Sequence, residues 1–220
     1  MARKKRLQHA ISHESEFVMK FNGKIDEQIV SDGSILGDII NSDKEIVIEV
    51  WCGKWERSLG FALENPDKNI IWIDKKWTRL SFWANWIVKN NLTNLCFIRW
   101  IANNMLHRFK PNSISQIHVI QPDPRWKWRD EHRRLTSPTF LELYNTLLKP
   151  NWKLIIQTDH EWLRNYTIDI IDKNMRKEII KSDDFHSLDI YSRQMFYMTS
   201  FEKKAIDQWK KIFYGIWEKI

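Results

Sequence analysis

Residues 44–55 read KEIVIEVWCGKW, and this stretch decides the fold class. Its first seven residues are rich in β-branched side chains, which predicts a strand that ends just before a turn. Runs of the same character predict further strands at 69–73, 94–98, 115–120 and 153–157. Segments with helical spacing lie between the strands, at 56–63, 78–89, 103–109 and 137–147. We therefore predict an α/β domain of the Rossmann-like type, with a mostly parallel sheet and helices on both faces.

The two ends of the chain are less regular. Residues 161–181 have the spacing of one long amphipathic helix, and weaker strand signals follow at 188–190 and 212–216. Residues 1–43 have a basic start and no strong period, so we interpret them as an N-terminal arm and lead-in. The predicted domain then covers residues 44–220.

Length and composition argue against several classes of protein. The chain has 220 residues, the size of one ordinary domain, and no apolar run approaches the roughly 18 residues of a membrane span. The basic start is followed by a polar stretch rather than by the apolar segment of a secretion signal. Cys52 and Cys96 have no partners at metal-ligand spacing, so no zinc site is expected. We expect a cytoplasmic monomer that requires neither a membrane nor a metal.

The chain carries a formal charge of +7, from 35 Lys and Arg residues against 28 Asp and Glu residues. Neutralisation of phosphates by basic side chains drives nucleic-acid binding, so this charge favours a polyanionic partner. Many basic proteins bind no nucleic acid, and charge alone leaves that question even.

Acidic side chains stand at the carboxyl ends of the first two predicted strands. Glu49 precedes the turn at residues 51–55, and Asp74 ends the second strand. In folds of this kind the turn approaches a nucleotide-like cofactor, and the second acid accepts hydrogen bonds from a ribose diol. Glycine at positions 51, 53 and 55 would make a cofactor loop. Tryptophan at 51 and 55 is equally consistent with a strand end that packs two indoles.

The most specific pattern follows the fourth predicted strand, where residues 121–135 read QPDPRWKWRDEHRRL. Two prolines flank Asp123 and stiffen the loop that carries its carboxylate. Cationic side chains that suit RNA phosphates follow it: Lys127, Arg129, Arg133 and Arg134. A solvated charged loop is the alternative interpretation.

This loop resembles that of the bacterial tRNA (guanine-N7)-methyltransferases, in which Pro-Asp-Pro-Trp continues into Lys, Arg, His and a closing Lys/Arg-Arg-Arg-Leu at the same offsets. The resemblance extends from about Glu49 to the C-terminus and includes Thr158-Asp159 and Thr199-Ser200-Phe201-Glu202, which is similar to the family's Thr-x-Phe/Tyr-Glu. It implies a class I methyltransferase fold and transfer of a methyl group from S-adenosyl-L-methionine (SAM) to N7 of a guanine in tRNA. The variable-loop guanosine is the expected target.

The resemblance also implies roles for single residues. Asp123 is expected to be catalytic and to lie between the cofactor and the base. The expected SAM-binding residues are Glu49, Asp74, Ala102 and Asp123. The expected tRNA-binding residues are Lys127, Arg129, Arg133, Arg134, Asp159, Thr199, Phe201 and Glu202. Guanine N7 carries a lone pair and no proton, so the transfer needs no obligatory general base and can rely on alignment.

Two positions depart from the family pattern. Ile101 stands where an aspartate commonly contacts the adenine side of SAM, and Arg125 replaces the tryptophan of Pro-Asp-Pro-Trp. The first departure puts that cofactor contact in doubt, and the second weakens the expected packing of the loop. Neither removes the cations that follow.

Tryptophan is unusually frequent and glycine unusually rare. Typical usage predicts roughly 15 glycines in this length. The chain has 6 glycines and 13 tryptophans. Trp51, Trp55, Trp72 and Trp152 stand where the resemblance requires glycine, and Trp100, Trp126 and Trp209 lie in turn-like contexts where glycine is plausible. We hypothesise that the gene uses a code in which UGA means glycine and that the printed translation renders it as tryptophan.

Two alternative functions remain open. A SAM-dependent methyltransferase acting on another RNA, or on a protein, would differ only in the loops after the fourth strand. A non-catalytic RNA-binding protein would keep the basic loop and the fold while tryptophans block the SAM pocket.

Overall fold

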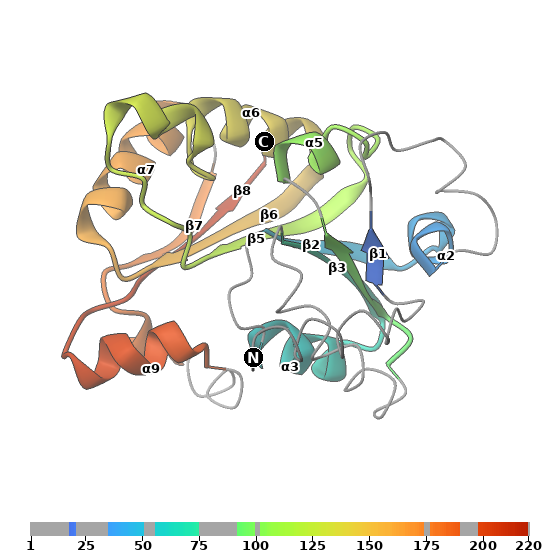
Figure 1. Cartoon of the computed structure of the whole chain (residues 1–220), viewed down its shortest axis with the longest axis horizontal. Coiled ribbons are helices and arrows are strands. Elements are labelled where there is room, and N and C mark those ends of the chain that lie inside the picture. Colours follow the sequence, from blue (N-terminus) through green and yellow to red (C-terminus); the bar gives the residue numbers. More distant parts are fainter. Residues whose placement is uncertain are drawn as a thin grey trace, which may run out of the picture.

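The computed structural model describes residues 18–20, 35–50, 56–74, 92–99, 102–173, 177–189 and 198–219. Within them lies one sheet of eight strands with helices on both faces (Figure 1). The strands are β1 (Val18–Lys20), β2 (Glu45–Val50), β3 (Lys68–Asp74), β4 (Leu95–Arg99), β5 (Ile114–Ile120), β6 (Leu148–Thr158), β7 (Lys177–Ser182) and β8 (Phe213–Glu218). The helices are α2 (Ile35–Asn41), α3 (Glu56–Glu64), α5 (Ala102–Leu106), α6 (Pro138–Leu147), α7 (Glu161–Lys173) and α9 (Ser200–Asp207). None of these helices is both long enough and apolar enough to span a membrane.

The strand order in the sheet is β1-β4-β3-β2-β5-β6-β8-β7. The first six strands in this order run parallel, and β8 runs antiparallel to both β6 and β7. From β2 the chain moves outward through β3 to β4 and then returns to β5, on the other side of β2. Such a reversal places the functional crevice at the carboxyl ends of β2 and β5.

Among the described residues, side chains from alternate positions of the strands build two hydrophobic clusters, one on each face. Ile48, Val50 and Ile156 belong to the larger cluster, together with buried residues of α5, α6 and α7. Ile155 and Ile216 belong to the other cluster, which includes Ala205 of α9. Figure 1 accordingly shows α5, α6 and α7 on one face and α3 and α9 on the other.

The sequence dictates where α6 begins. Ser137 caps it by accepting a hydrogen bond from the Phe140 amide, and Pro138 occupies the first turn, where its missing amide costs nothing. Leu141 and Tyr144, three residues apart, are buried against the sheet. The prediction of a helix over 137–147 is confirmed.

The five predicted central strands are confirmed as β2 to β6, and the weak signal at 212–216 is confirmed as β8. The prediction of one helix over 161–181 is wrong at its end, because α7 stops at Lys173 and residues 177–182 form β7. These residues gain backbone hydrogen bonds to β8, which local helical spacing does not reveal. The strand signal at 188–190 is also wrong for Leu188, which follows a 3₁₀ turn at Phe185–Ser187.

Part of the predicted lead-in belongs to the domain itself. β1 pairs with β4 at the edge of the sheet, and Leu36 and Ile39 of α2 are buried in the larger cluster. The boundary at residue 43 therefore lies inside the folded unit. The predicted helix at 78–89 and the turn at 51–55 lie outside the described residues.

Candidate functional site

Two predicted site residues, Glu49 and Asp74, lie at the carboxyl ends of adjoining parallel strands. Each is 3% exposed, which is unusual for a carboxylate. The register pairs Val50 with Ile73, so Asp74 stands at the very end of β3, beside the end of β2. Two buried carboxylates at this edge form an acceptor set for hydroxyl and ammonium groups. Ala102 opens α5 and is also buried, while Ile101 lies outside the described residues.

The loop after β5 holds Asp123 open to solvent. Gln121 turns the chain out of the strand with a φ of 47°, and Pro122 is buried. The Asp123 carboxylate is 60% exposed, and its Oδ2 lies 3.9 Å from a terminal nitrogen of Arg125. Arg125, which replaces the family's tryptophan, therefore provides Asp123 with a weak ionic neighbour and is itself mostly covered.

Three of the four predicted RNA cations face solvent. Lys127 and Arg129 are exposed. Arg133 is 55% exposed at its side chain and lies 3.6 Å from Asp130. Trp126 and Trp128 alternate with these cations and are 67% and 81% exposed. Flexible cations with free access to water suit contacts to phosphate oxygens.

Arg134, the fourth predicted RNA cation, has a different environment. The residue is 2% exposed, and its guanidinium lies 4.7 Å from the ring centre of Trp162 and 4.6 Å from that of Tyr166. It donates hydrogen bonds to the carbonyl oxygens of Arg125, at 2.9 Å, and Lys127, at 3.2 Å. These contacts fasten the basic loop to α7, and the Arg134 guanidinium does not face solvent in this structure.

Asp159 is joined to the Asp123 loop through Gln121. The backbone amide of Asp159 donates to the side-chain oxygen of Gln121 at 3.0 Å. The backbone amide of Gln121 donates to the backbone carbonyl of Gln157 at 2.8 Å. The loop that carries the predicted catalytic carboxylate, Asp123, and the loop that carries Asp159, a predicted tRNA-binding residue, therefore form one hydrogen-bonded unit.

The motif near the C-terminus forms the start of α9. Thr199 and Glu202 make a capping box, in which the Thr199 amide donates to Glu202 Oε2 at 2.8 Å and the Glu202 amide donates to Thr199 Oγ1 at 3.1 Å. This box occupies one carboxylate oxygen of the buried Glu202 in a structural role. Phe201, between them, is 46% exposed.

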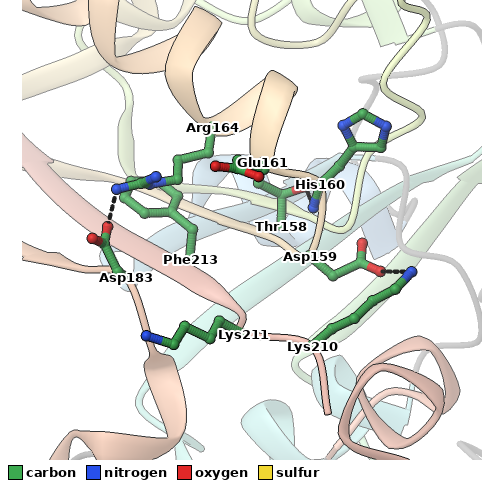
Figure 2. Close-up of a pocket in the computed structure, with 9 residues that line it drawn as sticks. All are labelled: Thr158, Asp159, His160, Glu161, Arg164, Asp183, Lys210, Lys211 and Phe213. Atoms are coloured by element: carbon green, nitrogen blue, oxygen red, sulfur yellow. Dashed lines mark hydrogen bonds and ion pairs between the residues drawn. The ribbon is translucent and has the colours of Figure 1, made fainter. Parts of the chain in front are cut away.

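A pocket of about 520 Å³ opens beside Asp159. Its lining residues come from the end of β6, the start of α7, the segment after β7 and the segment before β8 (Figure 2). They are Thr158, Asp159, His160, Glu161, Arg164, Asp183, Lys210, Lys211 and Phe213. Thr199 and Glu202 are not among the described residues that line it.

Sequence reasoning missed Gln121, Lys210 and Lys211. A signal for the two lysines does exist, because they immediately precede the last strand. Since β8 is antiparallel, its beginning lies at the same edge as the carboxyl ends of the parallel strands, as the pairing of Thr158 with Phe213 demonstrates. A prediction that included the direction of this strand would have placed both lysines at the site.

Sequence reasoning also missed a buried polar cluster beneath the site. Arg57 of α3 donates a hydrogen bond to the Gln157 side chain, and His118 of β5 is buried against the Phe61 ring. Burial, aided by the nearby Arg57 charge, lowers the pKa of His118 to about 3. His118 is therefore neutral at physiological pH, and Arg57 links α3 to β6.

Comparisons with known proteins agree on one family of enzymes. Residues 43–214 match a protein family described as "Putative methyltransferase". The chain is 30% identical to the tRNA (guanine-N(7)-)-methyltransferase of Bacteroides thetaiotaomicron over 178 residues, which cover 80% of this chain and 69% of that protein. It is 29% identical to the enzyme of the same name from Christiangramia forsetii, with 80% of each chain covered.

The fold is similar to the crystal structure of the 16S rRNA methyltransferase KamB. The TM-score is 0.63, with 90% of this chain and 96% of that chain covered, and the sequences are 14% identical. At that identity the likeness concerns the fold, which confirms the predicted Rossmann-like methyltransferase architecture.

Proposed function

The chain belongs to the tRNA (guanine-N7)-methyltransferase family, and on that premise we propose that it transfers a methyl group from SAM to N7 of a guanine in tRNA. The observation that carries the proposal is the hydrogen bond between Asp159 and Gln121, because it joins the loops of the two predicted site carboxylates. We further propose that the guanosine lies in the variable loop and that the enzyme works in the cytoplasm as a monomer.

The residues that the structure describes fit the cofactor. SAM presents an ammonium group and a ribose diol, both of which donate hydrogen bonds, and Glu49 and Asp74 offer buried acceptors at neighbouring strand ends. SAM supplies the electrophilic methyl group. Ala102, at the start of α5, is the third proposed contact, and Asp123 extends from the loop after β5 on the substrate side.

Positioning is the main contribution of the protein in this mechanism. The N7 lone pair is the nucleophile, and no proton has to leave, so the enzyme gains rate by holding N7 in line with the methyl group. We assign the positioning to three carboxylates. Asp159 accepts hydrogen bonds from the base, and Glu202 assists it through the carboxylate oxygen that the capping box does not use. Asp123 holds the base against the cofactor. The resemblance also assigns Thr199 and Phe201, next to Glu202 at the start of α9, to tRNA binding. Lys127, Arg129 and Arg133 bind phosphates of the tRNA.

We also propose that the cell inserts glycine at position 209 and, by the same code, at positions 51, 55, 72 and 152. Trp209 has a φ of 56°, and its side chain is 96% exposed. Its amide donates to the Ile206 carbonyl at 2.9 Å, and the Lys210 amide donates to the Ala205 carbonyl at 2.8 Å. These two bonds are the Schellman motif, whose left-handed position is usually glycine because any side chain there is strained.

The other tryptophans give the code proposal less support. Trp72 is fully buried, with its ring 4.5 Å from that of Phe97, and Trp152 is partly buried beside Asn151, which itself has a φ of 64°. Trp217 is also buried, and its ring occupies the space next to the Gly215 backbone. The code proposal therefore rests on position 209 in the described residues.

Methyl transfer from labelled SAM to a tRNA transcript, followed by chemical cleavage specific for N7-methylguanosine, tests the proposed function. A single cleavage in the variable loop is the expected result. Label in the RNA without N7-specific cleavage would favour methylation at another atom. Binding of tRNA without heat of SAM binding in calorimetry would favour the non-catalytic RNA-binding alternative.

A further inference from the structure

The pocket beside Asp159 extends well beyond the carboxylate that is proposed to hold the base. Arg164 and Phe213 line it on the side of α7 and β8, and Asp183 lies at its far end. A volume of about 520 Å³ leaves room for more than one polar group of a ligand. The contents of this extension have no role in the proposed transfer step.

The basic side chains of the extension differ in whether they have an ionic partner among the described residues. Arg164 is paired with Asp183 and lies 5.8 Å from the ring centre of Phe213. The Lys210 ammonium lies 3.9 Å from Asp159 Oδ2, and its side chain is 52% exposed. Lys211 is exposed, and no carboxylate of the described residues lies within ion-pair distance of its ammonium. Figure 2 shows Lys210 directed toward Asp159 and Lys211 directed toward the side of Asp183.

An ammonium group with no ionic partner among the described residues, at the rim of a pocket that contains the carboxylate proposed to hold the base, suits an anionic group close to that base. In RNA that group is a phosphate of the nucleotide chain. Glu161, at the start of α7 on the opposite wall, forms no ion pair with another residue in the described part of the chain. The positive side of the extension is therefore the side formed by the segment before β8.

We propose that the pocket extension binds the ribose-phosphate backbone next to the target guanosine, with Lys211 on a flanking phosphate and Lys210 nearer the target nucleotide. The inference rests on the proposed function, since it assumes that Asp159 holds the base. When the base donates its hydrogen bonds to Asp159, the weak ion pair of Lys210 is released, and this ammonium becomes available to the RNA as well.

The test pairs a change in the protein with a change in the RNA. The substrate is a stem-loop RNA that carries the variable loop, made with its natural phosphates or with the phosphate on either side of the target guanosine replaced by a neutral methylphosphonate. The proteins are the wild type, Lys211→Ala, Lys210→Ala and the control Lys203→Ala, whose exposed lysine lies on α9 outside the pocket. The measured quantities are kcat/KM and the equilibrium Kd for each RNA.

We expect one of the two methylphosphonates to weaken binding by wild type and by Lys203→Ala about tenfold, a change of about 1.4 kcal/mol. Lys211→Ala should bind that RNA and the natural RNA with equal affinity, because the variant lacks the lysine that would contact the replaced phosphate. Its log Kd should also vary less steeply with log salt, by about 0.7, as expected for one lost phosphate contact on a single strand. SAM affinity should be the same in all four proteins.

The inference would be overturned if each methylphosphonate raised the Kd of wild type and of Lys211→Ala by the same factor. The Lys210→Ala variant gives the same comparison if Lys211→Ala does not fold. Failure of the proposed function has a different signature. The wild type would then methylate none of the RNAs, while the Kd values would still report whether the phosphate contact exists.

Discussion

The backbone amide of Asp159 donates a hydrogen bond to the side-chain oxygen of Gln121, over a distance of 3.0 Å. This bond crosses from the loop after β6 to the loop after β5, the neighbouring parallel strand. The carboxylate proposed to hold the base and the one proposed to lie against the cofactor are therefore set by one local network. Geometry of this kind is what a reaction without proton transfer requires, because misplacement of a reactant by about 1 Å can cost on the order of a hundredfold in rate.

Asp123→Ala should lower kcat for tRNA methylation by at least about a hundredfold, with the tRNA Kd within about threefold of wild type, because the change removes a positioning group and no cation. Single-turnover methyl transfer and filter binding measure the two quantities. Asp130→Ala is the matched control, since it removes a carboxylate of the same loop that pairs with Arg133. Full activity of Asp123→Ala would contradict the catalytic assignment.

The sequence predicts the centre of this fold well and its edges poorly. Runs such as 44–50 and 115–120 are rich in β-branched residues because both faces of these parallel strands are buried. Each strand can therefore be recognised from its local sequence. β7 has exposed or half-exposed residues throughout and lies at the edge of the sheet. Its identity depends on pairing with β8, which local spacing cannot indicate.

The candidate site divides in the same way. Glu49, Asp74 and Asp123 follow directly from strand ends, because the carboxyl ends of parallel strands share one edge. The burial of Arg134 could not be inferred, since its aromatic partners Trp162 and Tyr166 lie on a helix that follows a later strand. Within the basic run 127–134, sequence alone gives no means of separating a cation that faces RNA from one that holds the loop.

Arg134→Ala should lower the free energy of unfolding by about 3 kcal/mol, because it leaves two loop carbonyls and Glu131 without their buried partner. Urea unfolding at neutral pH measures this loss. Arg133→Ala, which removes a half-exposed guanidinium one residue earlier, should change stability by less than about 0.5 kcal/mol. If Arg134→Ala were as stable as wild type and bound tRNA more weakly, Arg134 would be a phosphate contact after all.

His118 makes stability depend on pH. Burial, with the nearby Arg57 charge, lowers the pKa of His118 to about 3, against 6.5 for the unfolded chain. Below pH 6.5 His118 therefore binds a proton in the unfolded state but not in the folded state. The free energy of unfolding falls as the pH falls toward 3. By pH 5 this histidine alone should cost about 2 kcal/mol relative to neutral pH.

Urea unfolding of wild type and His118→Gln at pH 7.5 and pH 5 isolates this contribution. The drop in stability between the two pH values should be about 2 kcal/mol smaller in the variant, whatever its absolute stability. His107→Gln is the control, because His107 is exposed. An equal drop in wild type and His118→Gln would mean that His118 is protonated in the folded protein.

Trp209→Gly should raise the free energy of unfolding by about 1 kcal/mol, because it removes a side chain from a left-handed backbone position that strains any residue with a Cβ atom. The exposed indole contributes little burial in compensation, since it is 96% exposed. Gln208→Gly at the preceding residue is the matched control. Its φ of −97° is ordinary, so glycine there should lower stability through the added freedom of the unfolded chain.

Stabilisation by Trp209→Gly together with loss of stability in Gln208→Gly would place the glycine preference at one position of the α9 terminus. Mass spectrometry of the peptide that contains residue 209, from protein made in its native cells, then reads the residue that the cell inserts. Glycine in that peptide would also favour glycine at 51 and 55, and with it an open cofactor loop. Tryptophan in the peptide, with destabilisation by Trp209→Gly, would reject the code proposal and make the RNA-binding alternative the stronger one.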